Sequence, residues 1–284
     1  MEFAHGPATI KLGDLVVRRL GFGAMRLPGP AVWGEPANPD EARAVLRRAV
    51  ELGVQLVDTA WYYGPDVANR LIAEALHPYP SDLVIATKLG ACRTPDKGWH
   101  SFHRPAELRT GLETDLRGLR LEQIAIVHLR WMPGIEVPFA EALDALIEEK
   151  SRGRIRHLAL SNVTVEQLEL ALARTPIVSV QNLYVAAGSP PTLGAPSSHP
   201  DGAAMLAACE ARSIAFLPFF PLAMGALAKA ESLLAADAKR LRCTPAQAAI
   251  ASLLARSPVM LPIPGTSNVA HLEQNVRATS IAFN

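Results

Sequence analysis

The chain has 284 residues, of which 49% are hydrophobic and 19% charged, and its formal net charge is +1. This composition supplies a large apolar core and excludes a disordered protein. The charge is balanced and no block of Lys or Arg stands out, so nucleic acid and anionic membranes are not expected partners. We expect a small-molecule partner, and the sequence leaves the oligomeric state open.

Membrane and export signals are not expected. The longest uncharged apolar stretch, residues 214–228, contains two prolines and is shorter than the ~20 residues of a spanning helix. Residues 1–7 lack a basic region followed by an apolar run, so we expect no secretory signal and a cytoplasmic location. An odd number of widely spaced cysteines is typical of free thiols in a reducing compartment; these are Cys92, Cys209 and Cys243.

Short apolar segments rich in β-formers alternate with longer amphipathic segments along the whole chain. Strands are predicted at 17–25, 56–60, 83–88, 124–129, 155–161, 177–182, 214–220 and 259–264. Helices are predicted at 40–52, 67–76, 105–119, 139–149, 165–173, 202–212, 245–255 and 269–278, with an extra one at 232–241. Eight strand–helix units predict an α/β fold, a closed (β/α)8 TIM barrel.

Capping signals support these helix starts. A polar cap followed by Pro and then Glu or Gln occurs at Asn38 and Thr244, and Thr164 with Gln167 forms a similar box. Residues 9–15 are predicted to pair with the next segment as a hairpin that closes the barrel floor. The one long Pro/Gly/Ser-rich stretch, 187–201, lies inside a strand–helix connection and is either a lid or irregular surface. We therefore expect one domain over residues 1–284.

Four polar residues stand where three successive predicted strands run out into loops. Asp58 ends the second strand, Tyr63 follows in its loop, Lys88 ends the third strand and His128 lies near the end of the fourth. In such barrels these positions share one mouth, where chemistry takes place. A carbonyl that accepts hydride builds negative charge on oxygen, and Tyr63 can supply the proton if the Lys88 ammonium lowers its pKa. Asp58 would keep Lys88 charged, and His128 would orient the carbonyl.

Each of these residues also has a purely structural interpretation, and only their joint placement favours catalysis. Asp58 can cap a loop, Tyr63 can pack at the rim, Lys88 can be solvated and His128 can be a core residue. A barrel aldolase or lyase with a Schiff base on Lys88 is a further alternative.

The motifs Asp58-Thr59-Ala60-Trp61-Tyr62-Tyr63-Gly64 and Ala86-Thr87-Lys88, with His128, Ser161-Asn162 and Gln181-Asn182, resemble the aldo-keto reductase family. The similarity spans about residues 17–275 and is closest to a compact bacterial branch, of which some members reduce pyridoxal. It implies a carbonyl reductase in which Tyr63 donates the proton, Lys88 and Asp58 tune it and His128 orients the substrate. It also implies NADPH as cofactor, without a metal.

The same resemblance implies a cofactor site along the barrel mouth. The implied nicotinamide side consists of Met25, Asp58, Ser161, Asn162, Gln181 and Phe219, followed by Pro221 and Leu222 at the start of the loop over the pyrophosphate. The implied adenosine-phosphate side consists of Gly265, Thr266, Ser267, His271, Gln274 and Asn275. The family's Lys and Arg that contact the 2′-phosphate are replaced by Gly265 and His271, which leaves NADH possible beside NADPH.

The substrate is expected to be a flat or apolar carbonyl compound such as pyridoxal. All four tryptophans fall in the first four strand–helix connections, where they can line the pocket; they are Trp33, Trp61, Trp99 and Trp131. His100 and His103 have a spacing that suits a metal only on a helix and lack a third ligand, so a solvent-facing loop is favoured. The alternative function is an NADPH-binding sensor or regulatory subunit with little turnover.

Overall fold

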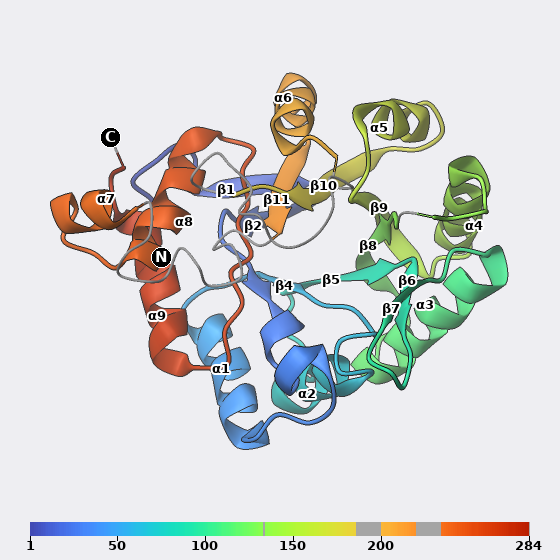
Figure 1. Ribbon diagram of the computed structural model, residues 1–284, viewed down its shortest axis with the longest axis horizontal. Helices are drawn as coiled ribbons and strands as arrows, with labels where there is room; N and C mark the ends of the chain where they lie inside the picture. Colours follow the sequence, from blue (N-terminus) through green and yellow to red (C-terminus); the bar gives the residue numbers. More distant parts are fainter. Residues whose placement is uncertain (133, 186–199, 220–233, 284) are drawn as a thin grey trace.

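The computed structural model describes residues 1–132, 134–185, 200–219 and 234–283. A ring of parallel strands, with helices packed around its outside, dominates the view in Figure 1. Seven strands form one parallel sheet, with spatial order following chain order. They are β3 (Phe22–Gly23), β4 (Leu56–Asp58), β5 (Val84–Leu89), β8 (Ile124–Arg130), β9 (Ile155–Ser161), β10 (Ile177–Leu183) and β11 (Ala215–Phe219).

The extended segment 259–264 closes the ring between the two ends of this sheet. Towards β11, the Leu261 N–H donates to the Phe216 carbonyl at 2.8 Å; towards β3, the Gly21 N–H donates to the Pro262 carbonyl at 2.9 Å. Pro262 and Pro264 have no N–H, so the segment bonds its neighbours sparsely and forms an isolated bridge instead of a regular strand. The predicted TIM barrel is confirmed.

The first predicted strand, 17–25, is wrong as a single element. Its first part belongs to β2 (Leu15–Arg18), which pairs antiparallel with β1 (Thr9–Leu12), and only β3 joins the barrel. Gly23 allows β3 to approach segment 259–264 closely, because a Cβ there would lie 2.6 Å from the Ile263 carbonyl oxygen. The hairpin β1–β2 packs Leu12 and Val17 into one cluster with residues that begin the barrel strands, so it covers the end opposite the mouth, as predicted.

The helices lie close to their predicted positions, and none of those described is long and apolar enough to cross a membrane. They are α1 (Pro39–Glu51), α2 (Val67–Leu76), α3 (Pro105–Leu119), α4 (Phe139–Ser151), α5 (Val165–Leu172), α6 (Gly202–Arg212), α7 (Ala235–Arg240), α8 (Pro245–Arg256) and α9 (Val269–Arg277). The predicted side-chain caps at Asn38, Thr164 and Thr244 each accept a backbone N–H of the first turn. Short 3-10 turns occur at Ala24–Arg26, Pro30–Val32 and Ala278–Ser280.

An unpredicted hairpin follows β5. Strands β6 (Ala91–Arg93) and β7 (Trp99–Ser101) pair antiparallel within the segment expected to be a plain loop. Most of the expected loop at 187–201, and the predicted cofactor residues Pro221 and Leu222, lie outside the described residues.

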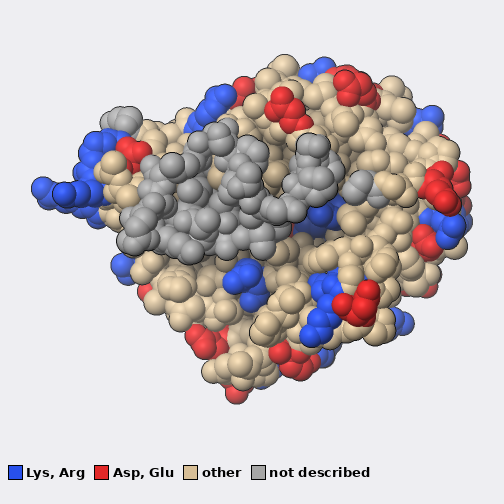
Figure 2. All heavy atoms as spheres, viewed as in Figure 1, with Lys and Arg blue, Asp and Glu red and all other residues tan. Residues whose placement is uncertain are grey.

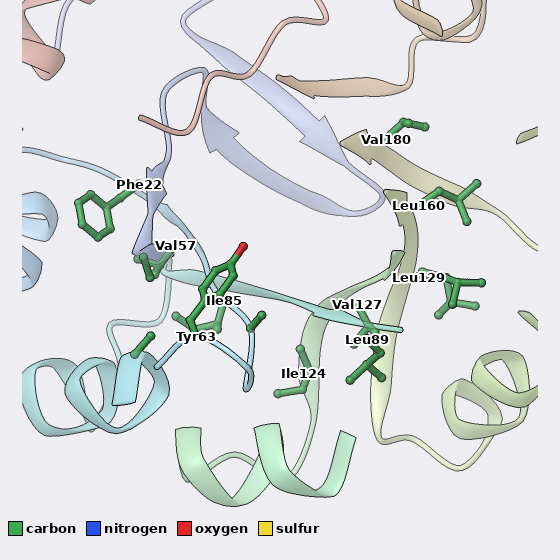
Figure 3. Packing of buried hydrophobic residues seen from close by; sticks show 14 of the residues in the cluster. Phe22, Val57, Tyr63, Ile85, Leu89, Ile124, Val127, Leu129, Leu160 and Val180 are labelled. Atoms are coloured by element: carbon green, nitrogen blue, oxygen red, sulfur yellow. The ribbon is translucent and has the colours of Figure 1, made fainter. Parts of the chain in front are cut away.

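The two faces of each barrel strand have different surroundings: one face packs against the helices and the other faces the inside of the barrel. Figure 3 shows Val127, Leu129 and Leu160 pointing outward towards the helices, whereas the Tyr63 hydroxyl points to the middle of the ring. Val127 and Leu129 are two residues apart, which is the period of a β-strand, so His128 between them faces the inside of the barrel. This period leaves the inward-facing positions at the strand ends free for polar side chains.

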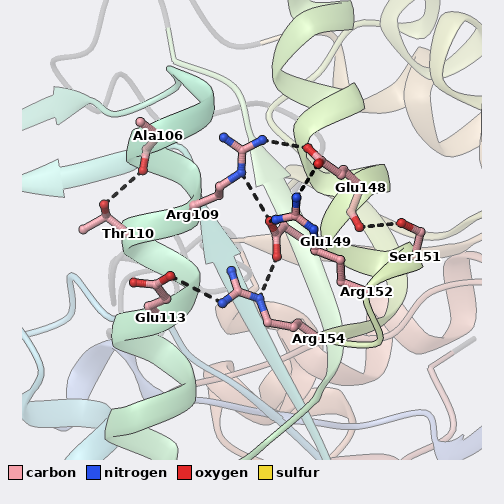
Figure 4. A network of polar contacts seen from close by, with 9 residues as sticks. All are labelled: Ala106, Arg109, Thr110, Glu113, Glu148, Glu149, Ser151, Arg152 and Arg154. Atoms are coloured by element: carbon pink, nitrogen blue, oxygen red, sulfur yellow. Dashed lines mark hydrogen bonds and ion pairs between the residues drawn. The ribbon is translucent and has the colours of Figure 1, made fainter.

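A charged network joins α3 to α4 on the outside of the barrel (Figure 4). The Glu149 carboxylate is fully buried and accepts bonds from Arg109, Arg152 and Arg154 at 3.3, 2.9 and 2.6 Å. Its neighbour Glu148 is 44% exposed. Three arginine partners satisfy the buried carboxylate. Without them, an unpaired charge buried in this place would be strongly unfavourable.

Replacing Glu149 should therefore destabilise the fold without touching the mouth. We expect Glu149→Gln to lower the free energy of unfolding by about 1–3 kcal/mol, and Glu148→Gln by less than about 1 kcal/mol because its ion pairs are solvated. Urea unfolding of the two variants measures both effects. Equal losses of unfolding free energy in the two variants would contradict the conclusion that buried Glu149 stabilises the fold more than exposed Glu148.

Candidate active site

The barrel brings the four predicted catalytic residues to its mouth. Asp58 ends β4, Lys88 lies one residue before the end of β5, and His128 stands directly opposite Lys88 in the pairing of β5 with β8. Tyr63 lies in the loop after β4, where its N–H donates to the Ala60 carbonyl at 3.0 Å. All four side chains are buried. Strand register thus places them together, as the spacing predicts.

Lys88 and Asp58 form an ion pair within the barrel. Lys88 Nζ donates to Asp58 Oδ2 at 2.6 Å and to the Thr59 carbonyl at 3.0 Å. The second carboxylate oxygen accepts from Gln181 Nε2 at 2.9 Å. The two side chains are 1% and 4% exposed. Each charge is therefore paired and hydrogen-bonded, which is the condition for keeping an ion pair out of water.

Tyr63 lies over this ion pair, with Lys88 Nζ 5.0 Å from its ring centre. The net lowering of the Tyr63 pKa that the sequence predicts is not found in this structure. Burial raises the pKa of Tyr63 far above its usual value, the Asp58 charge adds to that rise, and Arg130 opposes it. The carboxylate of Asp58 offsets the Lys88 charge, so the phenol holds its proton at neutral pH.

His128 is held as a neutral imidazole. Burial lowers the pKa of His128 to about 4. Its Nδ1 lies 3.2 Å from the Thr87 carbonyl oxygen, which can only accept, so the proton sits on Nδ1. Nε2 then accepts from Ser179 Oγ at 3.1 Å. In this arrangement no N–H of His128 is left to donate to a carbonyl oxygen.

A buried polar chain, missed by the sequence reasoning, supports the site from behind. Asn69 accepts from Thr59 Oγ1 at 2.8 Å and donates to Asp115 Oδ1 at 2.6 Å, and Thr87 donates to Asp115 Oδ2 at 2.7 Å. Burial raises the pKa of Asp115 to about 7. The chain connects α2 and α3 to the two threonines whose carbonyls hold Lys88 and His128. The sequence points to this region only through Asp58 and Lys88, which are next to the two threonines in the chain; nothing in it indicates Asn69 or Asp115.

A cleft of about 1090 Å³ opens above these residues. Its wall includes Tyr62, Tyr63, Met132, Phe219 and, of the four predicted tryptophans, Trp99. The others have different neighbours. They are Trp33, beside Arg93; Trp61, against Tyr62 and Phe102; and Trp131, between His103 and Phe139.

The predicted nicotinamide residues surround the same cleft. Met25, Asn162, Gln181 and Phe219 line it, and Ser161 pairs with Gln181 across β9 and β10. Ser161 Oγ is buried and has no hydrogen-bond partner among the described residues. A carboxamide offers both donors and acceptors, so it can satisfy this hydroxyl. The residues present therefore fit a nicotinamide group.

The predicted adenosine-phosphate residues lie around the start of α9. Ser267 lines the cleft, Thr266 Oγ1 accepts from the Asn268 N–H at 3.1 Å, and Asn268 caps the helix by accepting from the His271 N–H. The predicted contacts His271, Gln274 and Asn275 are on α9 itself, and only Asn275 is buried. Gly265 approaches Gly23 so closely that a Cβ would lie 2.4 Å from the Gly23 carbonyl oxygen. That contact explains why this chain has Gly there instead of Lys.

The histidine pair of the loop after β5 is split by the hairpin β6–β7. His100 is exposed, whereas His103 is buried with Nε2 2.7 Å from the Arg130 carbonyl oxygen. Within the described part of the chain, no three His, Cys, Asp or Glu side chains converge as metal ligands.

Comparison with known proteins identifies the class. The aldo/keto reductase family model matches residues 19–284. A pyridoxine 4-dehydrogenase of Escherichia coli (strain K12) is 42% identical over 278 residues, which cover 96% of this chain and 93% of that protein. An uncharacterized oxidoreductase of Schizosaccharomyces pombe is also 42% identical over 278 residues, with coverages of 98% and 87%. The chain belongs to the aldo/keto reductase family and is an oxidoreductase.

Solved structures agree on the barrel. A thermostable aldo-keto reductase in complex with the inhibitor epalrestat has a TM-score of 0.79 and 26% identity, covering 97% of this chain and 95% of that one. An aldo-keto reductase from Klebsiella pneumoniae in complex with NADPH has a TM-score of 0.77 and 23% identity, with coverages of 97% and 90%.

Two adjacent phenols allow a matched test of the proton donor. Tyr63→Phe should lower kcat for carbonyl reduction by about 100-fold or more, because the Tyr63 ring is the one that lies over Lys88. Tyr62→Phe should change kcat by less than about threefold, since Tyr62 OH has no hydrogen-bond partner among the described residues. Steady-state NADPH oxidation measures both, and NADPH titration checks that binding is kept. Near wild-type turnover by Tyr63→Phe would contradict the assignment.

The pKa values predict different pH profiles for the two reaction directions. Reduction needs the protonated phenol, and the raised Tyr63 pKa keeps it protonated, so kcat for reduction should be flat from pH 6 to 9. Alcohol oxidation needs the phenolate, so its rate should rise with pH, by up to about tenfold per unit below that pKa. Initial rates in both directions, in one buffer series, give the profiles. A reductive rate that falls between pH 7 and 8 would mean that the donor titrates there.

Proposed function

We propose that the enzyme reduces an aldehyde or ketone to an alcohol with NADPH, and that Tyr63 supplies the proton. The observation that carries this proposal is the buried phenol of Tyr63, next to the Lys88–Asp58 ion pair and facing a cleft. The unsatisfied Ser161 hydroxyl beside that cleft supports the cofactor position.

The chain's own groups divide the work as follows. Bound NADPH supplies the hydride. Tyr63 donates its hydroxyl proton to the carbonyl oxygen, and Lys88 stabilises the phenolate that remains. Asp58 holds Lys88 and is itself held by Gln181, and the burial of the ion pair strengthens these interactions.

The contacts of Lys88 disfavour an aldolase or lyase. A Schiff base needs a free amine, but Lys88 Nζ is bound to Asp58 and to the Thr59 carbonyl and is 1% exposed. The same pair would have to break before any covalent step. A reductase uses Lys88 where it lies.

NADP(H) is the cofactor of the family, and one local feature supports NADPH for this chain. Gly265 replaces the family's Lys, but Arg26 lies beside it, with its Cγ 3.4 Å from where a Gly265 Cβ would be. Arg26 lines the cleft together with Ser267. A guanidinium there can pair with a 2′-phosphate.

A flat aromatic aldehyde such as pyridoxal is the candidate substrate. The related Escherichia coli protein is a pyridoxine 4-dehydrogenase. In this chain Tyr62, Trp99, Met132 and Phe219 give the cleft an aromatic and apolar wall, which suits a flat ring.

The direct test is NADPH oxidation with pyridoxal, benzaldehyde, methylglyoxal and a keto-steroid. We expect turnover of the aromatic aldehydes, and kcat/KM with NADPH at least about tenfold above that with NADH, which Arg26→Met should reduce. Tight NADPH binding without turnover of any member of the panel would instead indicate a sensor or regulatory subunit.

A further inference from the structure

Arg130 occupies the substrate side of the cleft. It is the last residue of β8 and follows His128 by two positions, so both side chains face the inside of the barrel and Arg130 lies nearer the mouth. It lines the cleft with Tyr63 and Met132, and its guanidinium carbon is 5.6 Å from the Phe219 ring centre. Its charge acts on both neighbouring phenols, opposing the rise in pKa of Tyr62 and Tyr63.

Arg130 is half-buried, and its hydrogen bonding differs from that of the buried arginine of the cleft. Arg93 is anchored, because it donates to the carbonyls of Ala31, Val32 and Lys97. Arg130 Nε is buried without a hydrogen-bond partner in the described part of the chain. Leaving a buried N–H without a hydrogen bond is unfavourable. An oxygen anion on a bound molecule would satisfy it and would match the fork of N–H groups.

The barrel order argues that this anion belongs to the substrate. Strand β8 is the middle strand of the seven, whereas segment 259–264, which leads to Ser267 and α9, closes the ring on the opposite side. The phosphate-binding residues therefore lie across the mouth from Arg130. Arg130 lines the cleft with Tyr63, and neutral His128, two residues earlier on β8, already uses Nδ1–H on Thr87. Arg26, Arg93 and Lys97 also line the cleft, but Arg130 is the lining cation whose charge acts on Tyr63, where a carbonyl compound would lie.

We propose that Arg130 binds an anionic oxygen of the substrate, and that the enzyme prefers carbonyl compounds with such an oxygen beside the carbonyl group. An α-carboxylate and an ortho-phenolate both place an oxygen anion next to the reacting group. The 3-hydroxyl of pyridoxal, which is ortho to its aldehyde, has this chemistry. This substrate class rests on the proposed reductase function.

Pairs of substrates that differ only in the anion test the proposal. Phenylglyoxylate and its methyl ester share a ring and a ketone; pyridoxal and its 3-O-methyl ether share a ring and an aldehyde. Arg130→Met should lower kcat/KM for the anionic member of a pair by about 10- to 100-fold, and for the neutral member by less than about threefold. Arg130→Lys, which keeps the charge, should retain part of the preference. The pair with the larger loss identifies the carboxylate or the phenolate as the source.

Two controls separate this inference from other causes. Arg104→Met removes an arginine that is 67% exposed and outside the cleft lining, and it should leave both members of each pair unchanged. NADPH affinity, measured by fluorescence titration, should be the same in wild type and Arg130→Met. Equal losses on acid and ester, or a weaker NADPH complex in both Arg130 variants, would overturn the proposal.

A binding measurement decides the question even if the proposed reaction fails. Benzoate should bind the enzyme–NADP⁺ complex in competition with the substrate site and quench tryptophan fluorescence, since Trp99 lines the cleft. Arg130→Met should weaken benzoate binding by about tenfold or more. No turnover of any carbonyl by wild type would reject the reductase function, whereas benzoate binding that is unchanged in Arg130→Met would reject the anion site.

Discussion

The buried ion pair between Lys88 and Asp58 is the constraint on which the mouth of the barrel depends. Desolvating two charges is expensive, and the pair persists because further bonds from Gln181 and to the Thr59 carbonyl complete its hydrogen bonding. These contacts join β4, β5 and β10 at their carboxyl ends, and thereby set the spacing of the residues around them. Apolar side chains of similar size would pack with less desolvation cost, so the pair is better explained by the chemistry that it positions than by stability.

The electrostatic effect of the pair differs from that of a lone lysine. Asp58 offsets the charge of Lys88, and burial then determines the protonation of its neighbours, so that Tyr63 keeps its proton and His128 stays neutral. A neutral His128, bonded to Thr87 and Ser179, is fixed within the barrel. Two residues further along β8, Arg130 lines the cleft, and we propose that it supplies the positive charge that faces the substrate. The mouth thus combines a neutral acid, Tyr63, with a separate cation, Arg130.

Much of this arrangement follows from local sequence rules. Hydrophobic periodicity and caps locate most helices within two residues, and the placement of polar residues at strand ends brings Asp58, Lys88 and His128 together. Long-range contacts decide the rest. The close approach of β3 to the closing segment depends on Gly23, and the irregularity of that segment depends on two prolines. The hairpin β6–β7 turns Trp99 into the cleft, whereas Trp61 and Trp131 pack elsewhere. Arg130 belongs to no motif, and its proposed role depends on a buried Nε without a hydrogen-bond partner among the described residues.

Transfer of deuterium from labelled NADPH tests most directly whether this mouth reduces a carbonyl group. NADPH carrying deuterium at both C4 positions of the nicotinamide would be incubated with the wild-type enzyme and pyridoxal, and the product analysed by mass spectrometry and NMR. A reductase with hydride delivered to the carbonyl carbon and a proton delivered by Tyr63 predicts one deuterium on the carbinol carbon and none on the hydroxyl oxygen after exchange into water. Product formed without deuterium on that carbon, or NADPH oxidised without any alcohol product, would contradict the mechanism.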